Sequence, residues 1–328
     1  MKRYIYPISF ILVFIIPNLL LIEFNNNTKS ESMPITMFRE NKETIQKILV
    51  NDGSVIREMN LDEYILHVLL GEVPAEFEIE ALKAQAVAIR TYTLRNVLKQ
   101  SKHKNADVCT DSSCCQAYQE LEGFLASGGA QVNLDKMRSA VFATEGEVLT
   151  YEGELIDATY FSCSGGMTED AVAVWGTDVP YLRAVASPGE EGTRHYVSTF
   201  YYTTAEFLIK LGLENNIPIS EESIVPTYTN GNGVATLIVA DRIFTGTQIR
   251  SLLELPSTAF EISVQGENVL IQAKGYGHRV GMSQYGAEAM AVSGKNYKEI
   301  LMHYYQGAKL EQLSKEGMKA IFDKAGNL

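Results

Sequence analysis

The residue best suited to acid/base chemistry is Glu72, which stands between a glycine and a Val-Pro pair. Its neighbours Leu70, Val73 and Phe77 are apolar, and loss of water raises the pKa of a carboxyl group toward the range of a general acid. A nearby helix N-terminus acts in the opposite direction, because its positive end favours the charged form. Plain enrichment of acids at a helix start explains the glutamates at 76, 78 and 80 better than it explains Glu72, which precedes the kink.

A second group of reactive side chains combines thiols with an imidazole in one short polar segment: His103, Cys109, Cys114 and Cys115. Structural zinc takes four nitrogen or sulfur ligands, so the set favours a structural Zn²⁺ site, with Cys114 as its least suited member because adjacent cysteines rarely both reach one ion. The alternatives are a disulfide, such as Cys109 with Cys163, or thiols without a bond. A zinc hydrolase would further need an open coordination position and a base.

Small hydroxyls and glycines follow in the stretch Tyr160-Phe161-Ser162-Cys163-Ser164-Gly165-Gly166, where backbone N–H groups can approach a ligand. A Cys163 nucleophile would need His278 or His195 as its base, and a small buried cysteine at a strand end is the simpler interpretation. The glycine-rich segment 275–287 has no Lys-Ser/Thr pair, which argues against a phosphate-binding loop. We interpret it as a polar groove wall, the alternative being a turn with several positive φ angles.

The elements that must position these residues can be read from caps and periodicity. Asn51-Asp52-Gly53 predicts the turn of a hairpin over 45–58, and Asn60 or Asp62 caps a short helix through Leu70, with Gly71 just past its end. A long alanine-rich helix is expected over 76–99, since its apolar residues recur every three or four positions. Pro74 restricts the residue before it to extended geometry and so kinks the junction between the two helices.

The rest of the chain mixes short strands and helices without regular βαβ spacing, which predicts an α+β fold: mixed helices and short antiparallel strands around the long alanine-rich helix. Helices are expected over 137–143 and 297–305, within 200–212, after 244–246, and beyond 313. Strands are expected around 151–154 and over 234–240, 260–264 and 269–273.

The first residues indicate the compartment. Lys2 and Arg3 precede an apolar run to Phe24 that is long enough to cross a bilayer, so we expect a transmembrane anchor over 1–24 with its N-terminus in the cytoplasm. A cleaved signal peptide is the alternative, although no small-residue cleavage site follows. Residues 25–36 form a tether, and 37–328 form an extracytoplasmic α+β catalytic region, with room for a division into two lobes near 190–200. The space outside the cytoplasm has no supply of ATP, which disfavours kinases and ligases. Polymers of the cell envelope are the favoured substrates there.

Charge excludes another class of partner, because the 328 residues carry a formal net charge of −12, and an acidic surface repels nucleic acid.

In combination and in this order, the motifs resemble the stage II sporulation protein D family, whose relatives include amidase-enhancer proteins. The matching segments are 71–74, 80–92, 160–166, 174–175, 180–182, 277–287 and 303–305. Arg279 departs from the family, which usually has glycine after the histidine, and this affects the expected contour of the groove wall.

The resemblance implies a membrane-anchored lytic transglycosylase that cuts peptide-stripped glycan strands between MurNAc and GlcNAc during engulfment. It implies Glu72 as the catalytic acid and a zinc loop on His103, Cys109 and Cys115, with Cys114 in place of a histidine ligand. It also implies two partners, a cell-wall amidase/endopeptidase and a membrane protein. A non-enzymatic, glycan-binding enhancer of an amidase is the alternative. We expect these residues to contact the glycan in a groove: Tyr160, Ser162, Ser164, Gly165, His278, Gln284 and Tyr285.

Overall fold

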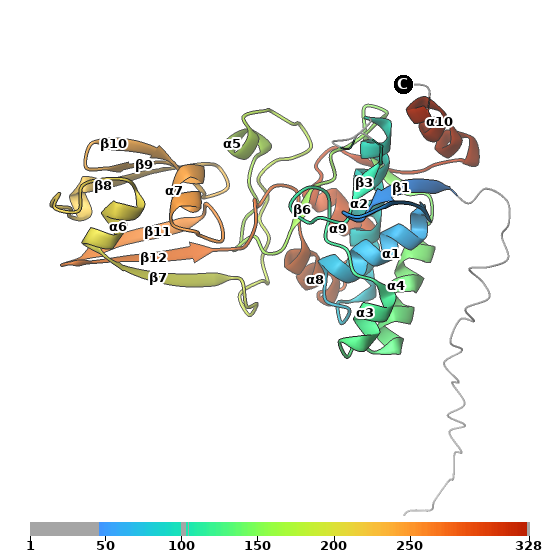
Figure 1. Ribbon diagram of the computed structural model, residues 1–328, viewed down its shortest axis with the longest axis horizontal. Coiled ribbons are helices and arrows are strands. Elements are labelled where there is room, and N and C mark those ends of the chain that lie inside the picture. The colour runs from blue at the N-terminus through green and yellow to red at the C-terminus, as the bar shows by residue number, and fades with distance from the viewer. Residues whose placement is uncertain (1–45, 100–102, 104, 327–328) are drawn as a thin grey trace, which may run out of the picture.

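The computed structural model describes residues 46–99, 103 and 105–326. Two lobes lie end to end, one built around helices and one built mainly of strands (Figure 1). Each lobe has its own hydrophobic core, and the larger core belongs to the helical lobe. The predicted α+β class is therefore confirmed. The anchor predicted over 1–24 and the tether over 25–36 lie outside the described residues.

The first lobe contains most of the helices and three small sheets, whose strand orders are β2-β1-β3, β14-β4-β5 and β13-β6. Its helices are α1 (Leu61–Glu72), α2 (Ile79–Leu98), α3 (Leu121–Ala126), α4 (Gln131–Ala143), α8 (Gln284–Val292), α9 (Tyr297–Tyr304) and α10 (Lys315–Gly326). Its strands are β1 (Lys47–Asn51), β2 (Ile56–Asn60), β3 (Val108–Cys109), β4 (Glu147–Tyr151), β5 (Glu154–Leu155), β6 (Tyr160–Phe161), β13 (Met282–Ser283) and β14 (Lys309–Gln312).

Helix α1 begins and ends for identifiable reasons. The side chain of Asn60 accepts hydrogen bonds from the backbone N–H groups of Asp62 and Glu63, which caps the helix start. The prediction that the helix ends before Gly71 is wrong, because α1 continues through Glu72. Gly71 serves packing instead: a Cβ there would lie 2.7 Å from the backbone nitrogen of Tyr118. The helix ends at Val73, which is extended as the following proline requires.

Helix α2 is the central helix of the first lobe. It packs against α1, α4, α8, α9, α10 and β4. Its alanines keep several faces small, so that backbones can approach on more than one side. Arg90 is fully buried, and its Nη1 donates to the carbonyl oxygen of Thr144 at 2.7 Å, while its Nη2 lies 3.2 Å from Asp62 Oδ1. Arg90 therefore links α2 to Asp62 of α1 and to Thr144 at the end of α4.

The second lobe is formed by the part of the chain between β6 and β13. These two strands pair in parallel within the first lobe. Its two antiparallel sheets have the orders β11-β12-β7 and β10-β9-β8. The strands are β7 (Val197–Thr203), β8 (Ile224–Tyr228), β9 (Val234–Val239), β10 (Arg242–Thr245), β11 (Phe260–Gln265) and β12 (Asn268–Lys274), and the helices are α6 (Thr204–Lys210) and α7 (Gly246–Leu252). A short helix, α5 (Ala171–Trp175), lies in the connection between the lobes.

The helix predicted within 200–212 is confirmed as α6, which begins at Thr204 because the residues up to Thr203 form β7. Exposure alternates along β7, with Phe200 and Tyr202 facing the core, which is the period of a strand. The strands predicted over 234–240, 260–264 and 269–273 and the helix after 246 are confirmed within one to two residues of their ends.

Among the described residues, no helix combines the length and the apolar character that crossing a membrane requires.

Candidate active site

Glu72 occupies the last turn of α1, where three hydrogen-bond donors surround its half-buried carboxyl group. Oε1 accepts from the backbone N–H of Ala117 at 2.7 Å, and Oε2 accepts from Gln284 Nε2 at 3.2 Å. Burial raises the pKa of Glu72, and hydrogen bonds from Ala117, Gln284 and the Tyr160 hydroxyl lower it by a smaller amount. The net effect is a pKa above the usual range, so loss of water outweighs the donors and favours the protonated acid.

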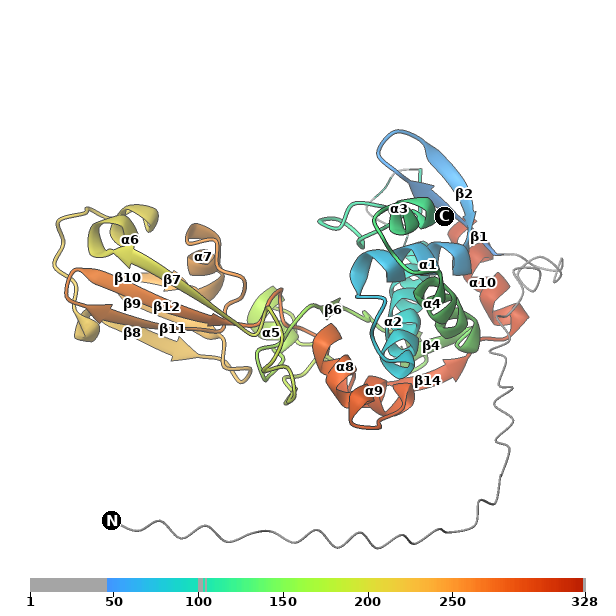
Figure 2. The ribbon, with the colours of Figure 1, turned by 90° about the horizontal axis from the view of Figure 1, so that it is seen from below.

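The donors come from three distant segments that meet at the end of α1. Tyr160 lies on β6, and its hydroxyl is also 2.8 Å from Gln116 Oε1. Gln116 Nε2 is 3.2 Å from Thr93 Oγ1 on α2, so this side chain links the loop to the central helix. Gln284 is buried and is the first residue of α8, at the side of the first lobe that faces the second lobe (Figure 2). No local sequence pattern marks Gln116 and Ala117, which lie more than forty residues from Glu72 in the chain.

The predicted metal-ligand set comes together in the loop that leads to Ala117. One potential ligand atom from each of His103, Cys109, Cys114 and Cys115 lies within 4.8 Å of all the others. His103 Nε2 is 3.3 Å from Cys115 Sγ and 3.6 Å from Cys114 Sγ, so both adjacent thiols reach the same point. Two or more thiolates with one imidazole suit Zn²⁺, and the cluster could hold a single ion. The disulfide alternative is wrong, since all four cysteines are described and none is bonded to another.

A buried carboxyl group that sequence analysis did not identify organises the Tyr160–Gly166 stretch. Glu190 Oε2 accepts from the backbone and the hydroxyl of Ser164, each at 2.8 Å, and from Gly165 N at 2.9 Å. The same oxygen accepts from Cys163 Sγ at 3.2 Å, and Oε1 accepts from Ser283 Oγ at 2.6 Å. Nothing in the local sequence marks Glu190, because these partners lie 25 or more residues away in the chain.

These contacts bear on the predicted glycan contacts of Ser164 and Gly165 and on the possibility of a Cys163 nucleophile. The Ser164 hydroxyl and the Gly165 N–H are directed at Glu190 in this structure. Cys163 is fully buried, and burial raises the pKa of its thiol to about 12, which suits a structural cysteine and not a nucleophile. The simpler interpretation of Cys163 is therefore supported.

Aromatic rings surround the remaining predicted contacts. His278 packs between Phe161 and Trp175, with ring centroids 5.6 and 5.4 Å away, and its Nδ1 accepts from Val280 N at 3.1 Å. Burial and the charge of Arg250 lower the pKa of His278 to about 4, so the imidazole is neutral at pH 7. Tyr285 packs edge-on against Phe77, next to the α1–α2 junction, at 5.3 Å.

Another predicted contact, Ser162, joins these segments through its backbone, because its carbonyl oxygen accepts from Tyr285 N at 3.0 Å. Thus Glu72, Tyr160, Gln284 and Tyr285 converge at one place, while Ser164 and Gly165 line the adjoining Glu190 network. An α+β fold that holds one partly buried carboxyl group of raised pKa among converging donors defines a candidate acid/base site.

Comparison with known proteins identifies the family. The family model described as Stage II sporulation protein (SpoIID) matches residues 51–151, which include Glu72 and the four potential metal ligands. Stage II sporulation protein D of Bacillus subtilis (strain 168) is 33% identical over 332 residues, 95% of this chain and 96% of that protein. Stage II sporulation protein D of Bacillus amyloliquefaciens is 36% identical over 263 residues, 78% of this chain and 76% of that protein.

The amidase enhancer of Bacillus subtilis (strain 168) is more distant, with 28% identity over 302 residues, 74% of this chain and 39% of that protein. The chain therefore belongs to the stage II sporulation protein D family, a family of sporulation proteins, and the resemblance inferred from the motifs is confirmed.

Proposed function

We propose that this protein is a lytic transglycosylase of sporulation, which cleaves peptide-stripped glycan strands of peptidoglycan between MurNAc and GlcNAc. The observation that carries the proposal is the environment of Glu72: its carboxyl group has a raised pKa and faces donors from Ala117, Gln284 and Tyr160. A group so placed can donate its proton to a substrate oxygen and is then stabilised as a carboxylate by the same donors.

A single carboxyl group suffices for this reaction, whereas ordinary glycosidases use two. Glu72 donates its proton to the glycosidic oxygen as the bond from that oxygen to C1 of MurNAc breaks. The C6 hydroxyl oxygen of the same sugar forms a new bond to C1, and its proton passes to the Glu72 carboxylate. The products are a 1,6-anhydro-MurNAc end and a free GlcNAc hydroxyl, and Glu72 is protonated again.

The donor set His103, Cys109, Cys114 and Cys115 would hold Zn²⁺ as a structural ion. Bound zinc would supply no reacting group here and would fix the loop, because Cys115 precedes Gln116 and Ala117, which contact Tyr160 and Glu72. A zinc hydrolase is not favoured, since all four ligand positions are filled by protein groups and leave no open one.

The direct test replaces Glu72 by glutamine, which keeps the shape of the side chain and removes its proton transfer. Purified Glu72→Gln should bind peptide-free glycan yet lose at least about 10²-fold in the rate of anhydro-MurNAc formation, measured by mass spectrometry. Glu76→Gln, an exposed acid beyond the helix kink, serves as the matched control and should cleave normally. An unchanged product yield from Glu72→Gln would refute the assignment of Glu72 as the catalytic acid.

A second candidate function is supported by the relative named amidase enhancer: a glycan-binding protein that stimulates an amidase without cutting glycan itself. The two functions are separated by incubating the purified protein alone with peptide-free glycan. Anhydro products without any amidase support the transglycosylase, and their absence together with faster amidase turnover supports the enhancer.

The proposal places the protein in the mother-cell membrane, with residues 1–24 as a single anchor and the catalytic region outside the cytoplasm. There it would work with a cell-wall amidase/endopeptidase, which strips the peptides, and with a membrane protein of the engulfment machinery. Co-purification from sporulating cells, with and without residues 1–24, tests both the anchor and the partners.

A further inference from the structure

A chain of hydrogen bonds runs from the carboxyl group of Glu72 into the interior of the first lobe. It passes through the side chains of Tyr160, Gln116 and Tyr64 and ends at the backbone carbonyl oxygen of Cys109. Gln116 is 3% exposed and Tyr64 is fully buried, so the chain is shielded from bulk water. Because hydroxyls and amides can donate at one atom and accept at another, the direction of these bonds decides what Glu72 meets.

The direction of the chain is set at its inner end. A carbonyl oxygen can only accept, so the Tyr64 hydroxyl donates its single proton to the carbonyl oxygen of Cys109, 3.5 Å away. The Tyr64 oxygen then accepts from Gln116 Nε2 at 3.4 Å, and the Thr93 hydroxyl oxygen accepts from the same nitrogen at 3.2 Å. These two acceptors fix the Gln116 amide, so that its Oε1 faces Tyr160.

Gln116 Oε1 therefore receives the proton of the Tyr160 hydroxyl, whose oxygen is 2.8 Å away. Burial raises the pKa of Tyr160 well above its usual range, so the hydroxyl keeps this proton. A hydroxyl that donates to Gln116 has no second proton for Glu72, but it still has lone pairs. A protonated Glu72 can donate its own proton to the Tyr160 oxygen.

Ionisation of Glu72 reverses this arrangement. The hydrogen bond from Tyr160 to the carboxylate requires the hydroxyl proton to turn away from Gln116. Among the described residues, Tyr160 is the donor on Gln116 Oε1, so the turn leaves a buried amide oxygen without a hydrogen bond. A buried acceptor without a donor is costly, and the protonated form of Glu72 avoids that cost.

Charged side chains do not account for the state of Glu72. Its pKa is raised by burial and lowered by three uncharged hydrogen-bond donors, and no charged group acts on it. The titratable groups that act on Tyr160 are Glu72 and three tyrosines, namely Tyr64, Tyr92 and Tyr305. Burial and the direction of uncharged hydrogen bonds therefore decide whether Glu72 holds its proton.

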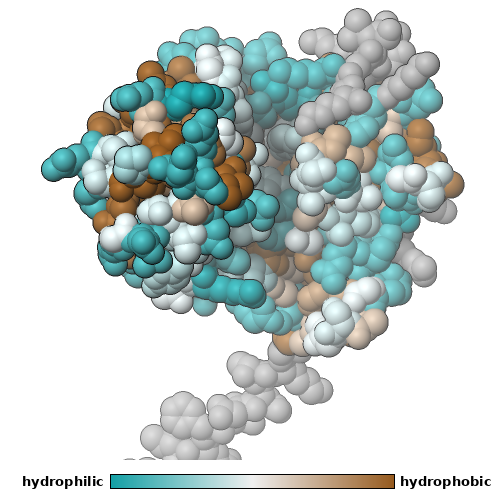
Figure 3. Space-filling view, turned by 60° about the vertical axis from the view of Figure 1, so that its left-hand side comes forward, coloured by the Kyte–Doolittle hydropathy of each residue, from teal (hydrophilic) through white to brown (hydrophobic). Residues whose placement is uncertain are grey.

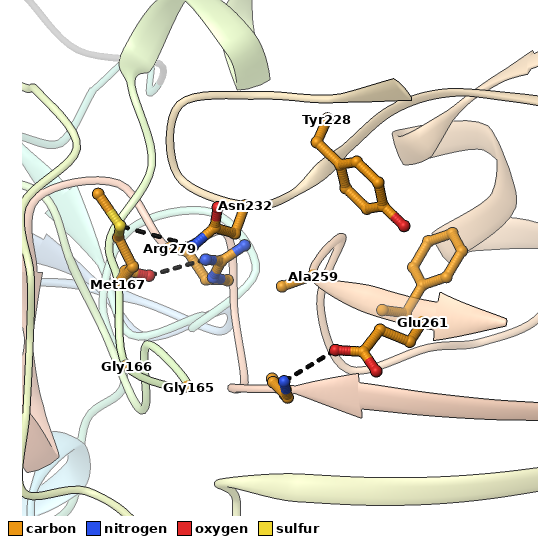
Figure 4. Close-up of a pocket in the computed structure, with 10 residues that line it drawn as sticks. Gly165, Gly166, Met167, Tyr228, Asn232, Ala259, Glu261 and Arg279 are labelled. Carbon is orange, nitrogen blue, oxygen red and sulfur yellow. Dashed lines mark hydrogen bonds and ion pairs between the residues drawn. The ribbon is translucent and has the colours of Figure 1, made fainter. Parts of the chain in front are cut away.

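Charged groups gather instead around a cavity of about 490 Å³ between the lobes, where the surface is hollowed in Figure 3. Arg279 Nη2 donates to the carbonyl oxygen of Met167 there, and Lys274 pairs with Glu261 (Figure 4). These groups have partners of their own and are not among the influences on the pKa of Glu72.

We propose that Gln116 is a positioning residue for the acid Glu72, a role that rests on the proposed function of that site. Gln116 holds the proton of the Tyr160 hydroxyl, so that the Tyr160 oxygen accepts the proton of Glu72 and stabilises the acid. When Glu72 gives its proton to the glycosidic oxygen, the Tyr160 proton turns from Gln116 to the new carboxylate. It turns back when the C6 hydroxyl returns a proton to Glu72.

The test replaces Gln116 by methionine, which keeps the length of the side chain and removes the acceptor. In Gln116→Met the Tyr160 proton stays on the Glu72 carboxylate, so the pKa of Glu72 falls. The carboxyl carbon signal of Glu72 in NMR, assigned by its absence from Glu72→Gln, should titrate at lower pH. The alkaline limb of the kcat/KM profile should move the same way, lowering activity on that side about tenfold, the effect of one hydrogen bond to an ionised group.

Gln85→Met is the matched control, because Gln85 is a buried glutamine of α2 whose amide has no hydrogen-bond partner among the described residues. It should leave the titration of Glu72 in place. Gln116→Met should also have no effect in a Tyr160→Phe background, which lacks the hydroxyl through which Gln116 acts. Tyr64→Phe lets the Gln116 amide rotate and should shift the titration in the same direction by less, so it carries the test if Gln116→Met does not fold.

A Glu72 titration that stays in place or moves to higher pH in these variants would overturn the role of Gln116, as would a full effect of Gln116→Met in Tyr160→Phe. The two proposals fail separately. A shifted titration in a protein that never forms anhydro products supports the role of Gln116 and refutes the activity. Anhydro products from a protein whose titration does not shift support the activity and refute the role of Gln116.

Discussion

At the scale of single residues, the raised pKa of Glu72 predicts a pH dependence that Gln284 controls. Burial favours the protonated acid, and the Gln284 amide opposes it by donating to the carboxylate. In Gln284→Met that donor is lost, so the pKa of Glu72 rises further and the acid stays protonated to higher pH. The alkaline limb of the kcat/KM profile should therefore move to higher pH, while the maximum rate falls because the carboxylate formed in the reaction loses a partner.

This prediction is checked by pH–rate profiles on peptide-free glycan. Ser293→Ala is the matched control on α8's far end, where the hydroxyl donates to Met290 and does not reach Glu72. An alkaline limb that stays in place, or moves to lower pH, would show that Gln284 does not tune the acid.

The close contact at Gly71 belongs to the scale of elements, since it joins α1 to the loop that carries Ala117. A Cβ at Gly71 would lie 2.7 Å from Tyr118 N and 2.9 Å from the carbonyl carbon of Ala117, both rigid backbone atoms. Gly71→Ala should therefore push the loop away from Glu72, lower the free energy of unfolding by about 1–3 kcal/mol and reduce cleavage. Urea unfolding and the cleavage assay measure both effects.

The matched control is Gly123→Ala in α3, where an added Cβ meets nothing within 4 Å. Alanine is the better helix former, so this variant should gain up to about 1 kcal/mol and cleave normally. A Gly71→Ala protein as stable and active as Gly123→Ala would contradict the packing role of Gly71.

Metal removal is the second test at the scale of elements. The loop 105–117 has little regular structure beyond β3, so an ion held by the four-ligand cluster would fix it. We expect one zinc per chain by elemental analysis, and Cys115→Ser should lower zinc content and reduce cleavage about 10–100-fold. Cys163→Ser is the control, because that thiol lies outside the cluster and contacts Glu190. Full zinc content in Cys115→Ser would exclude Cys115 as a ligand.

The same contacts show what the sequence could and could not predict. Helix α2, the junction at Pro74 and the metal-ligand set follow from local periodicity, proline geometry and spacing. Gly71 was misassigned as a helix stop, since the reason for a glycine there is the backbone of Tyr118, which only the tertiary structure brings near. Glu190 and Ala117 were missed for the same reason: no local pattern encodes partners that lie tens of residues away.

At the scale of the whole molecule, a small set of buried polar groups connects the two lobes, whose hydrophobic cores are separate. Glu169 lies in the segment that connects the first lobe to the second. It forms a parallel β-bridge with Val280, where the chain returns to the first lobe. Its carboxyl oxygens accept from the Thr229 hydroxyl and from Gly231 N, both in the second lobe. Arg279 donates to the carbonyl oxygen of Gly231 and so adds a second link. These bonds help to fix the relative position of the lobes.

Glu169→Ala should therefore loosen the second lobe from the first. Glu169 is 1% exposed, and its loss removes an acceptor from the Thr229 hydroxyl and from Gly231 N and leaves Glu190 as the remaining buried carboxyl group that acts on Arg279. We expect a loss of about 3 kcal/mol in the free energy of unfolding and faster amide exchange where β8 and β9 meet the connection. Glu261→Gln removes only an exposed pair with Lys274 and should cost less than about 1 kcal/mol. If both variants unfold and exchange alike, the lobes are held together by contacts other than those of Glu169.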